Sequence, residues 1–205
     1  MLKAVIFDFD GTLIQNLPLL VEVLNDYGKE HGIHIDDVEQ HRNKTLQELI
    51  KEMGLPFHRI ALLARRMKKE VRAKTSTTPF VPGMKSAMEA LAKEFKIGIV
   101  TANTEENVKI ILEREQLHAD FIYANSTILG KNRLLNKLLR EQQLTPADVI
   151  YVGDEVRDVE ACKRAKLHII AVTWGYNARE ILESYQADYV VDSPDDLLRI
   201  IRDLR

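Results

Sequence analysis

Cysteine and long apolar runs are nearly absent from this sequence. Cys162 is the one cysteine among 205 residues, which excludes an internal disulfide and a cysteine-based metal site. We expect Cys162 to be a packing residue. The first apolar run, Leu2–Phe7, is interrupted by Lys3 and is too short for a signal peptide, and no stretch reaches the ~20 apolar residues of a membrane span. These absences predict a cytoplasmic protein with no membrane association.

The sequence also lacks an excess of either charge. Lys and Arg together number 29 and Asp and Glu 31, which gives a net charge of −2 and a pI of about 6.3. Such a balance argues against a nucleic-acid-binding protein and against a polybasic membrane protein. It leaves room for a local basic pocket that binds a small anion.

Short runs rich in valine and isoleucine predict strands that are buried on both faces. Helical patterns separate most of them, and this alternation predicts an α/β fold with a doubly wound, mostly parallel sheet. The predicted strands are Ala4–Phe9, Ile97–Thr101, Phe121–Ala124, Val149–Val152, Ile169–Thr173 and Tyr189–Val191, and the predicted helices are Met84–Phe95, Glu105–Glu115, Arg133–Gln142, Val156–Ala165 and a last one capped by Ser193.

One interval interrupts this alternation. From about Asn16 to Thr78 apolar residues recur at helical spacing, and no strand is indicated. Gly and Pro residues divide the interval into several helices. We therefore expect residues 16–78 to form a small all-α domain inserted after the first strand, and residues 1–15 with 79–205 to form the α/β core.

The first predicted strand ends in the segment Asp8-Phe9-Asp10-Gly11-Thr12. Its two carboxylates project beyond the carboxyl edge of the sheet, where open α/β sheets bind their ligands. Placed together, they repel each other and lose hydration, and a divalent cation relieves that most simply. An N-cap residue followed by a turn aspartate is the alternative interpretation.

Further polar groups follow the ends of later strands. Thr101 and Asn103 offer a hydroxyl and an amide suited to a phosphoryl oxygen, and Lys131 offers a cation just before a helix. Asp154 and Asp158, four residues apart, fit a hard cation that binds oxygen ligands. Taken singly, Thr101 is also compatible with a helix cap, Lys131 with a surface lysine, and the two aspartates with a capping pair.

Together these residues resemble the motifs of the haloacid dehalogenase (HAD) superfamily, in order and approximate spacing, over essentially the whole chain. Asp8-x-Asp10-Gly-Thr is similar to the first motif, Thr101 to the second, Lys131 to the third and Gly-Asp154-x-x-x-Asp158 to the fourth. The segment 174–176 adds a similarity to phosphoglycolate phosphatase-like members. The resemblance implies a sheet order of 5-4-1-2-3 and a C1-type helical cap at residues 16–78.

The resemblance also implies an activity: a phosphatase that uses Mg²⁺ to hydrolyse a small phosphorylated metabolite, such as a phosphoglycolate-like or sugar-phosphate-like compound. Asp8 is then the nucleophile that forms an aspartyl-phosphate, and Asp10 is the general acid and base. The implied catalytic residues are Asp8, Asp10, Thr101 and Lys131; the implied metal ligands are Asp8, Asp10, Asp154 and Asp158; the implied substrate-binding residues are Gly11, Thr12, Ala102, Asn103, Arg42 and Lys44.

Two features bear on selectivity. Related members commonly carry an acid near position 15, where this chain has Gln15; the position lies at the hinge into the cap, so the change bears on cap closure or substrate preference. In capped relatives the region between cap helices faces the active site, so the resemblance places Arg42 or Lys44 over the leaving group. A solvent-exposed turn with Thr45 as N-cap is the alternative.

Four other functions are alternatives to that of a phosphatase, and two of them are compatible with the same motifs. A phosphomutase shares all four motifs and differs in how its cap excludes water, and a non-catalytic phosphate-binding protein needs no turnover. A P-loop NTPase is excluded because Asn125 stands where its first glycine is required and Asn132 follows Lys131. The helical insertion and the spacing of Asp8 and Asp10 argue against a response-regulator domain. No oligomeric state is indicated.

Overall fold

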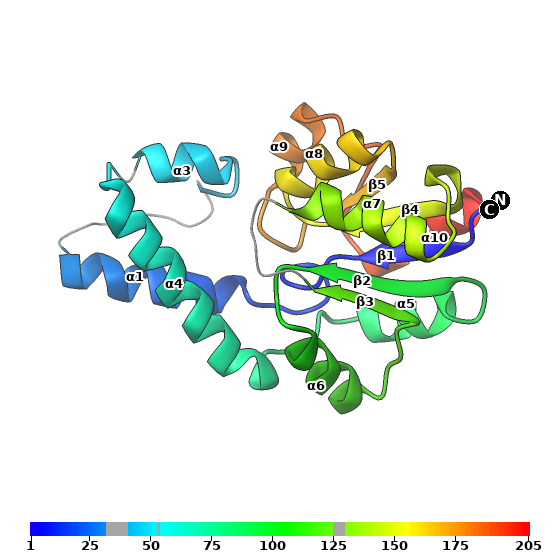
Figure 1. The fold of residues 1–205 in the computed structure, drawn as a ribbon, viewed down its shortest axis with the longest axis horizontal. Coiled ribbons are helices and arrows are strands. Elements are labelled where there is room, and N and C mark those ends of the chain that lie inside the picture. Colours follow the sequence, from blue (N-terminus) through cyan, green and yellow to red (C-terminus); the bar gives the residue numbers. More distant parts are fainter. Residues whose placement is uncertain (32–40, 53, 125–129) are drawn as a thin grey trace.

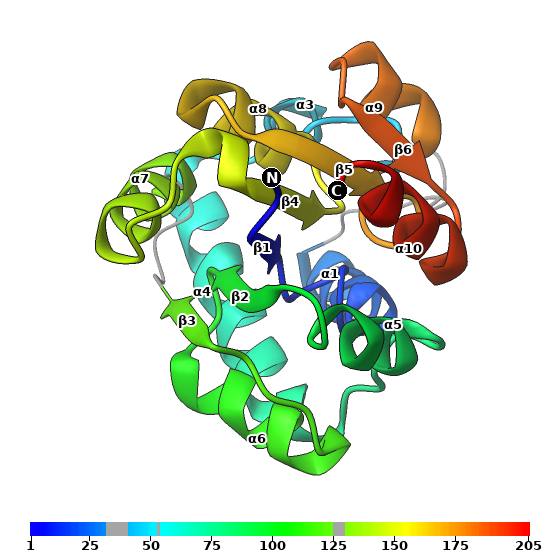
Figure 2. The ribbon, with the colours of Figure 1, turned by 90° about the vertical axis from the view of Figure 1, so that its right-hand side faces the viewer.

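A computed structural model describes residues 1–31, 41–52, 54–124 and 130–205 of the chain. At its centre is a six-stranded parallel sheet with the strand order β3-β2-β1-β4-β5-β6, which confirms the expected order and adds β6 at the edge. Figures 1 and 2 show the sheet between two layers of helices. The strands are β1 (Ala4–Phe7), β2 (Lys96–Thr101), β3 (Phe121–Ala124), β4 (Val149–Gly153), β5 (His168–Val172) and β6 (Tyr189–Val191).

Alternate residues of β1 point to opposite faces of the sheet and enter different cores. Val5 and Phe7 belong to the core beneath α5 (Met84–Leu91), α6 (Glu105–Glu115) and α10 (Pro194–Asp203). Ala4 and Ile6 belong to the core beneath α7 (Lys131–Glu141), α8 (Val156–Ala165) and α9 (Arg179–Ser184). Because both faces are covered, β1 is buried along its whole length, as its continuous apolar run predicts. Cys162 is buried in the second core.

The chain between β1 and β2 supplies a separate group of helices on the side opposite the two termini (Figure 1). They are α1 (Leu17–His31), α3 (Leu46–Glu52) and α4 (Phe57–Lys74), with a short 3₁₀ turn at Thr75–Thr77. We call residues 16–78 the helical segment. Its entry and exit run side by side, since Gln15 N–H donates to the Pro79 carbonyl over 2.8 Å and Ile14 forms an antiparallel bridge with Phe80.

Two details differ from the expectations. The first strand ends at Phe7 instead of Phe9, because the N–H groups of Leu13 and Ile14 both donate to the Phe9 carbonyl and fold the chain into a turn at Gly11 (φ 84°). In α4, the apolar pattern of the sequence predicts that Leu62 and Leu63 both pack inward, but Leu62 is 57% exposed while Leu63 is buried.

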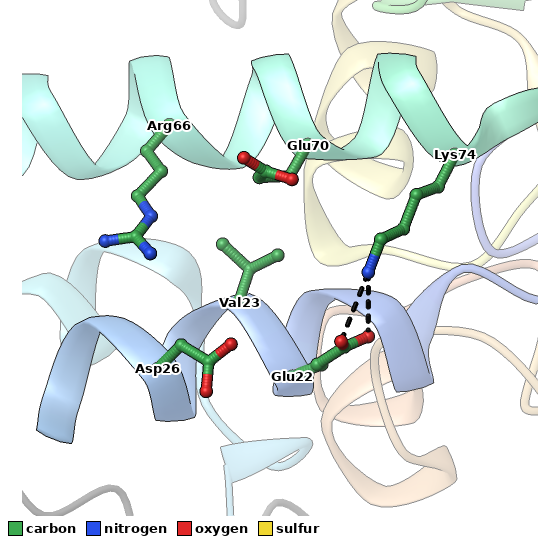
Figure 3. A pocket seen from close by; sticks show the side chains of 6 residues that line it. All are labelled: Glu22, Val23, Asp26, Arg66, Glu70 and Lys74. Carbon is green, nitrogen blue, oxygen red and sulfur yellow. Dashed lines mark hydrogen bonds and ion pairs between the residues drawn. The ribbon is translucent and has the colours of Figure 1, made fainter.

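Within the helical segment, α1 and α4 enclose a small pocket that Figure 3 shows from close by. Lys74 from α4 reaches across it to Glu22 of α1, with an Nζ–Oε1 distance of 3.1 Å. The pocket is lined mostly by charged side chains of these two helices: Glu22, Val23, Asp26, Arg66, Glu70 and Lys74. Throughout the described ranges, each helix is too short or too polar to cross a bilayer.

Candidate active site

The carboxyl ends of three adjacent strands bring the predicted site residues together. Asp8 follows β1, Thr101 ends β2 and Asp154 follows β4, and β1 lies between the other two strands. From β1 the strand order runs outward in both directions, so this edge is a topological switch point of the sheet. Both expected pairs of acids therefore reach one place although they lie far apart in the sequence.

Three buried carboxylates form the centre of this site. Asp8, Asp154 and Asp158 each place one oxygen within 4.8 Å of the others. The Thr12 hydroxyl donates to Asp154 Oδ1 over 2.8 Å, and Tyr176 N–H donates to Asp154 Oδ2 over 2.7 Å. These two donors hold the Asp154 carboxylate toward the cluster.

Glycine is required where the chain passes over Asp154. A Cβ atom at Gly11 or at Gly175 would lie 2.2 Å from Asp154 Oδ2, a separation that no side chain tolerates. Gly11 also needs its positive φ for the turn. The sequence thus leaves space for the carboxylate on both sides.

Lys131 is the cation of the cluster. It is the first residue of α7, after the N-cap Gly130, and its Nζ lies 2.9 Å from Asp8 Oδ2 and forms a second ion pair with Asp158. Burial alone would lower the pKa of Lys131, but the attraction of Asp158 and Asp8 outweighs it and raises the pKa above its usual range. Lys131 is therefore a fixed ammonium and not a surface lysine.

One ammonium does not neutralise three buried carboxylates. Burial raises the pKa of Asp8 to about 7, with Lys131 opposing the shift and Asp158 adding to it. Burial, together with repulsion from Glu155 and Asp8, raises the pKa of Asp154 well above its usual range. The uncompensated charge and the all-oxygen donor set both fit a hard divalent cation such as Mg²⁺.

Asp10 lies apart from this cluster and faces β2. Asn103 Nδ2 donates to Asp10 Oδ1 over 3.2 Å, and the Thr101 hydroxyl is 3.5 Å from Oδ2. Burial raises the pKa of Asp10 to about 6, while the Asn103 hydrogen bond lowers it in part. Asp8 and Asp10, two residues apart in the sequence, thus have separate surroundings.

Asn16 is a site residue that lies outside the motifs read from the sequence. Its Nδ2 donates to Asp10 Oδ1 over 2.8 Å, and its side chain is buried. It stands directly after Gln15, at the entry to the helical segment. Its position a few residues after the Asp-Gly-Thr turn is the signal that points to it, because that turn folds back onto Asp10.

The N-cap residues of α6 and α8 decide whether Thr101, Asp154 and Asp158 serve as helix caps. The N-cap of α6 is Thr104, so Thr101 is not a helix cap; its hydroxyl instead accepts from Asn103 N–H over 2.9 Å. Glu155 is the N-cap of α8, and Asp158 completes a capping box by accepting from Glu155 N–H. Asp158 therefore has a structural contact in addition to its place in the cluster.

The remaining predicted substrate-binding residues are spread around this edge. Ala102 is exposed beside Thr101, whereas the Thr12 hydroxyl is taken up by Asp154. The Arg42 guanidinium lies against the loop after β5, where it donates to the Thr173 carbonyl over 2.5 Å. Lys44 Nζ is 2.6 Å from Glu52 Oε2 within the helical segment. Thr45 and Glu48 make the reciprocal contacts of a capping box at the start of α3.

A doubly wound parallel sheet with an acidic, cation-compatible site at its switch point defines an α/β protein of the Rossmann-like class. The model of the haloacid dehalogenase-like hydrolase family matches residues 5–172. The chain belongs to this family, as its motifs indicate.

Relatives of known description cover almost the full chain. A phosphoglycolate phosphatase of Synechococcus elongatus is 33% identical, with 99% of each chain covered. A pyrophosphatase of Listeria monocytogenes is 24% identical, with 98% of this chain and 97% of its own covered. Among solved structures, a haloacid dehalogenase-like family protein from Streptococcus pneumoniae superimposes with a TM-score of 0.82 at 23% identity, with 98% of each chain covered; at that identity the likeness supports the fold alone.

Proposed function

We propose that this chain is a Mg²⁺-dependent phosphatase that hydrolyses a small phosphorylated metabolite through an aspartyl-phosphate on Asp8. The observation that carries the proposal is the difference between the surroundings of Asp8 and those of Asp10. Asp8 lies beside Lys131 and the other two buried carboxylates, whereas Asp10 lies among the donors Asn16, Thr101 and Asn103. One carboxylate is therefore placed for attack on phosphorus, and the other for proton transfer.

In the first step, Asp8 attacks the phosphorus of the ester and the leaving oxygen departs. Asp10 donates its proton to that oxygen, and a pKa near 6 is suitable for a group that must both give and take a proton. In the second step, Asp10 as a carboxylate takes a proton from the water that attacks the aspartyl-phosphate. Lys131, which is 2.9 Å from Asp8, stabilises the negative charge on the phosphoryl oxygens.

The carboxylates of Asp8 and Asp154 would hold the Mg²⁺ ion, with Asp158 beside Lys131 and the main-chain carbonyl of Asp10 as further ligands. When bound, the ion screens the repulsion between Asp8 and the dianionic phosphate. Thr101 and Asn103, with the backbone at Gly11, Thr12 and Ala102, would bind the phosphoryl oxygens.

The substrate class rests on the relatives. Two of them are described as a phosphoglycolate phosphatase and a pyrophosphatase, both of which act on small phosphorylated compounds. We propose that residues 16–78 are the cap over the core formed by residues 1–15 and 79–205, and that Arg42 and Lys44 face the leaving group from that cap. A chain with a single cysteine needs no disulfide, which is compatible with a protein that functions in the reducing cytoplasm.

The test is a screen of phosphorylated acids, sugar phosphates and pyrophosphate with purified protein and Mg²⁺, in which released phosphate is measured. A phosphatase releases phosphate from at least one of them, and excess chelator stops the release. A phosphomutase instead isomerises a sugar phosphate without net release, and a binding protein does neither. Mass spectrometry of the acid-quenched reaction should find a phosphoryl group on the peptide that contains Asp8.

A further inference from the structure

The loop after β5, residues 174–178, lies between the carboxylate cluster and the helical segment. On one side it holds Asp154: Tyr176 N–H donates to Asp154 Oδ2 over 2.7 Å, and Asn177 N–H donates to the Asp154 carbonyl over 3.1 Å. Trp174 anchors the start of the loop, because its Nε1–H donates to the Thr12 carbonyl over 3.1 Å. A displacement of this loop therefore moves groups that contact Asp154 directly.

On its other side, the same loop binds the turn of the helical segment at residues 42–44. Asn177 Nδ2 donates to the Arg42 carbonyl over 3.0 Å and to the Lys44 carbonyl over 3.1 Å. Ala178 N–H also donates to the Arg42 carbonyl, over 3.0 Å. The Arg42 guanidinium completes the contact through the Thr173 carbonyl. The turn is thus held both by its backbone carbonyls and by the Arg42 guanidinium, which donates to the carbonyls of Thr173 and Tyr176 and which alanine at position 42 would remove.

Asn177 is the residue that joins the two sides. Asn177 is 7% exposed, and its Oδ1 accepts from Val156 N–H, at the start of α8, over 2.9 Å. The orientation of the amide follows from its partners, because Val156 offers a donor and Arg42 and Lys44 offer acceptors. Both amide protons and the amide oxygen are used. A residue of another shape leaves buried backbone groups without partners, which is costly.

We propose that Asn177 is a positioning residue that couples the docking of the turn at residues 42–44 to the placement of Asp154. The inference rests on the proposed function in one respect, the role of Asp154 as a metal ligand. If docking favours the Asp154 geometry that binds Mg²⁺, then by linkage Mg²⁺ favours docking by the same factor. Substitutions on the side of the turn should then weaken metal binding although they contact neither Asp154 nor the ion.

The first measurement uses Mg²⁺ alone, without substrate. Hydrogen exchange, read by mass spectrometry, should slow in peptides that cover residues 41–45 and 174–178 when Mg²⁺ is added to the wild-type protein. In Asn177→Asp the oxygen facing Val156 is kept, while the donor to Arg42 and Lys44 is lost. We expect the turn to exchange faster and its response to Mg²⁺ to disappear.

The second measurement is Mg²⁺ affinity by calorimetry. Arg42→Ala and Asn177→Asp should each weaken binding about 5-fold or more, the usual lower end of coupling between sites. A negative charge added next to the site strengthens cation binding, whereas one at an exposed, more distant position is screened by solvent. A loss of affinity in Asn177→Asp therefore reports the lost docking. Asn136→Asp, at an exposed position of α7, is the matched charge control and should bind Mg²⁺ as the wild type does. Fluorescence of Trp174, the one tryptophan, should change with Mg²⁺ in the wild type and less in both variants.

The outcomes separate this inference from the proposed function. Equal Mg²⁺ affinity in the wild type, Arg42→Ala and Asn177→Asp overturns the coupling, and so does an absence of binding in all three. Turnover that persists with equal affinities leaves the phosphatase proposal intact. Conversely, coupled binding and exchange in a protein that hydrolyses none of the phosphates supports the coupling and overturns the phosphatase proposal. Arg42→Ala keeps the test decisive if the Asn177 variant fails to fold.

Discussion

The carboxyl edge of the sheet buries its charges, whereas the helical segment keeps its charges near water. Asp154 and Asp158 are 0% exposed, and they share their surroundings with Asp8 and one lysine. Between α1 and α4 the pairs are on the surface: the side chain of Lys74 is 46% exposed and that of its partner Glu22 is 59% exposed. Figure 3 shows these charges of both signs facing one another across the pocket.

The two arrangements have different energetic consequences. Exposed ion pairs contribute about 0–1 kcal/mol, because water already stabilises the separate charges. Buried carboxylates oppose folding in their charged form, because burial first and repulsion from neighbouring acids second raise the pKa values of Asp8 and Asp154. A cluster that lowers stability is retained for what it binds. We therefore expect the reaction to take place at the carboxyl edge of the sheet. Substitutions at the two regions should therefore differ in sign as well as size.

The largest contrast is expected for Asp8→Asn. Turnover should fall by about 10⁴-fold or more, because the nucleophile is lost. At pH 8 in chelator the variant should melt at a higher temperature than the wild type, because a neutral amide replaces a carboxylate that burial destabilises. Steady-state phosphate release and thermal denaturation check the two parts. Asp26→Asn, at an exposed ion pair of α1, is the control and should change neither quantity appreciably. Substantial residual turnover in Asp8→Asn would rule out the covalent mechanism.

Asp10→Asn should be next in size. For an alkyl phosphate, kcat should fall about 10²- to 10⁴-fold, the usual contribution of a general acid and base. For an aryl phosphate the loss should be smaller, because its leaving group departs without a proton. The comparison of the two substrates is the measurement, and equal losses for both contradict the role of Asp10 as the acid.

Removal of one proposed metal ligand should have a more selective effect. Asp154→Asn should raise the Mg²⁺ concentration needed for half-maximal activity by about 10-fold or more, while circular dichroism shows the fold unchanged. The one oxygen of the variant can still accept from Tyr176 N–H, and its NH2 group can donate to the Thr12 hydroxyl, which accepts as well as donates. Full wild-type activity in excess chelator would contradict the metal proposal altogether.

Most of the core could be predicted because its strands are continuous apolar runs that end in chemistry-bearing residues. Glu105–Glu115 and Val156–Ala165 were predicted with the bounds that the structure shows. The order of the strands came from the family resemblance, since periodicity alone does not determine which strands are neighbours. The short α9 was not predicted, because six residues hold too few turns to display a helical period.

The site was less predictable where it depends on tertiary contacts. Three site residues stand at the end of a strand or at the start of a helix, and such positions can be recognised in the sequence: Asp8, Lys131 and Asp154. Asn16 and Asn177 act through hydrogen bonds to partners at other places in the chain, Asp10 for the first and Arg42 and Lys44 for the second. The position of Asn16 shortly after the Asp-Gly-Thr turn is a weak local signal for its contact with Asp10. No pattern in the sequence indicates the distant partners of Asn177.

A pH titration of stability should distinguish the two regions again, with a moderate effect. Because folding raises the pKa of Asp8 from 3.8 to about 7 and that of Asp10 to about 6, the folded state binds more protons than the unfolded state between those values. In chelator, the free energy of unfolding should therefore fall as the pH rises from about 4 to about 7, by on the order of 1 kcal/mol per unit of pKa shift. Denaturant unfolding at several pH values measures this slope. Asp8→Asn should reduce the slope to the part that Asp10 contributes, and Asp26→Asn should leave it unchanged.

The smallest effect on activity and stability is expected for a substitution of Lys44. This residue is proposed to contribute to substrate selectivity, and it forms an ion pair with Glu52. The lysine side chain is 32% exposed and the glutamate 50%, so Lys44→Ala should change the free energy of unfolding by less than about 1 kcal/mol. If Lys44 turns from Glu52 to the leaving group, the variant should lose several-fold in kcat/KM on a phosphorylated acid and nothing on an aryl phosphate. Glu52→Gln should then act in the opposite direction, because it releases the ammonium. Lys51→Ala removes an equal charge from an exposed position of α3 and controls for net charge. Equal kcat/KM values for Lys44→Ala and Lys51→Ala on both substrates would mean that the turn contributes its backbone carbonyls alone.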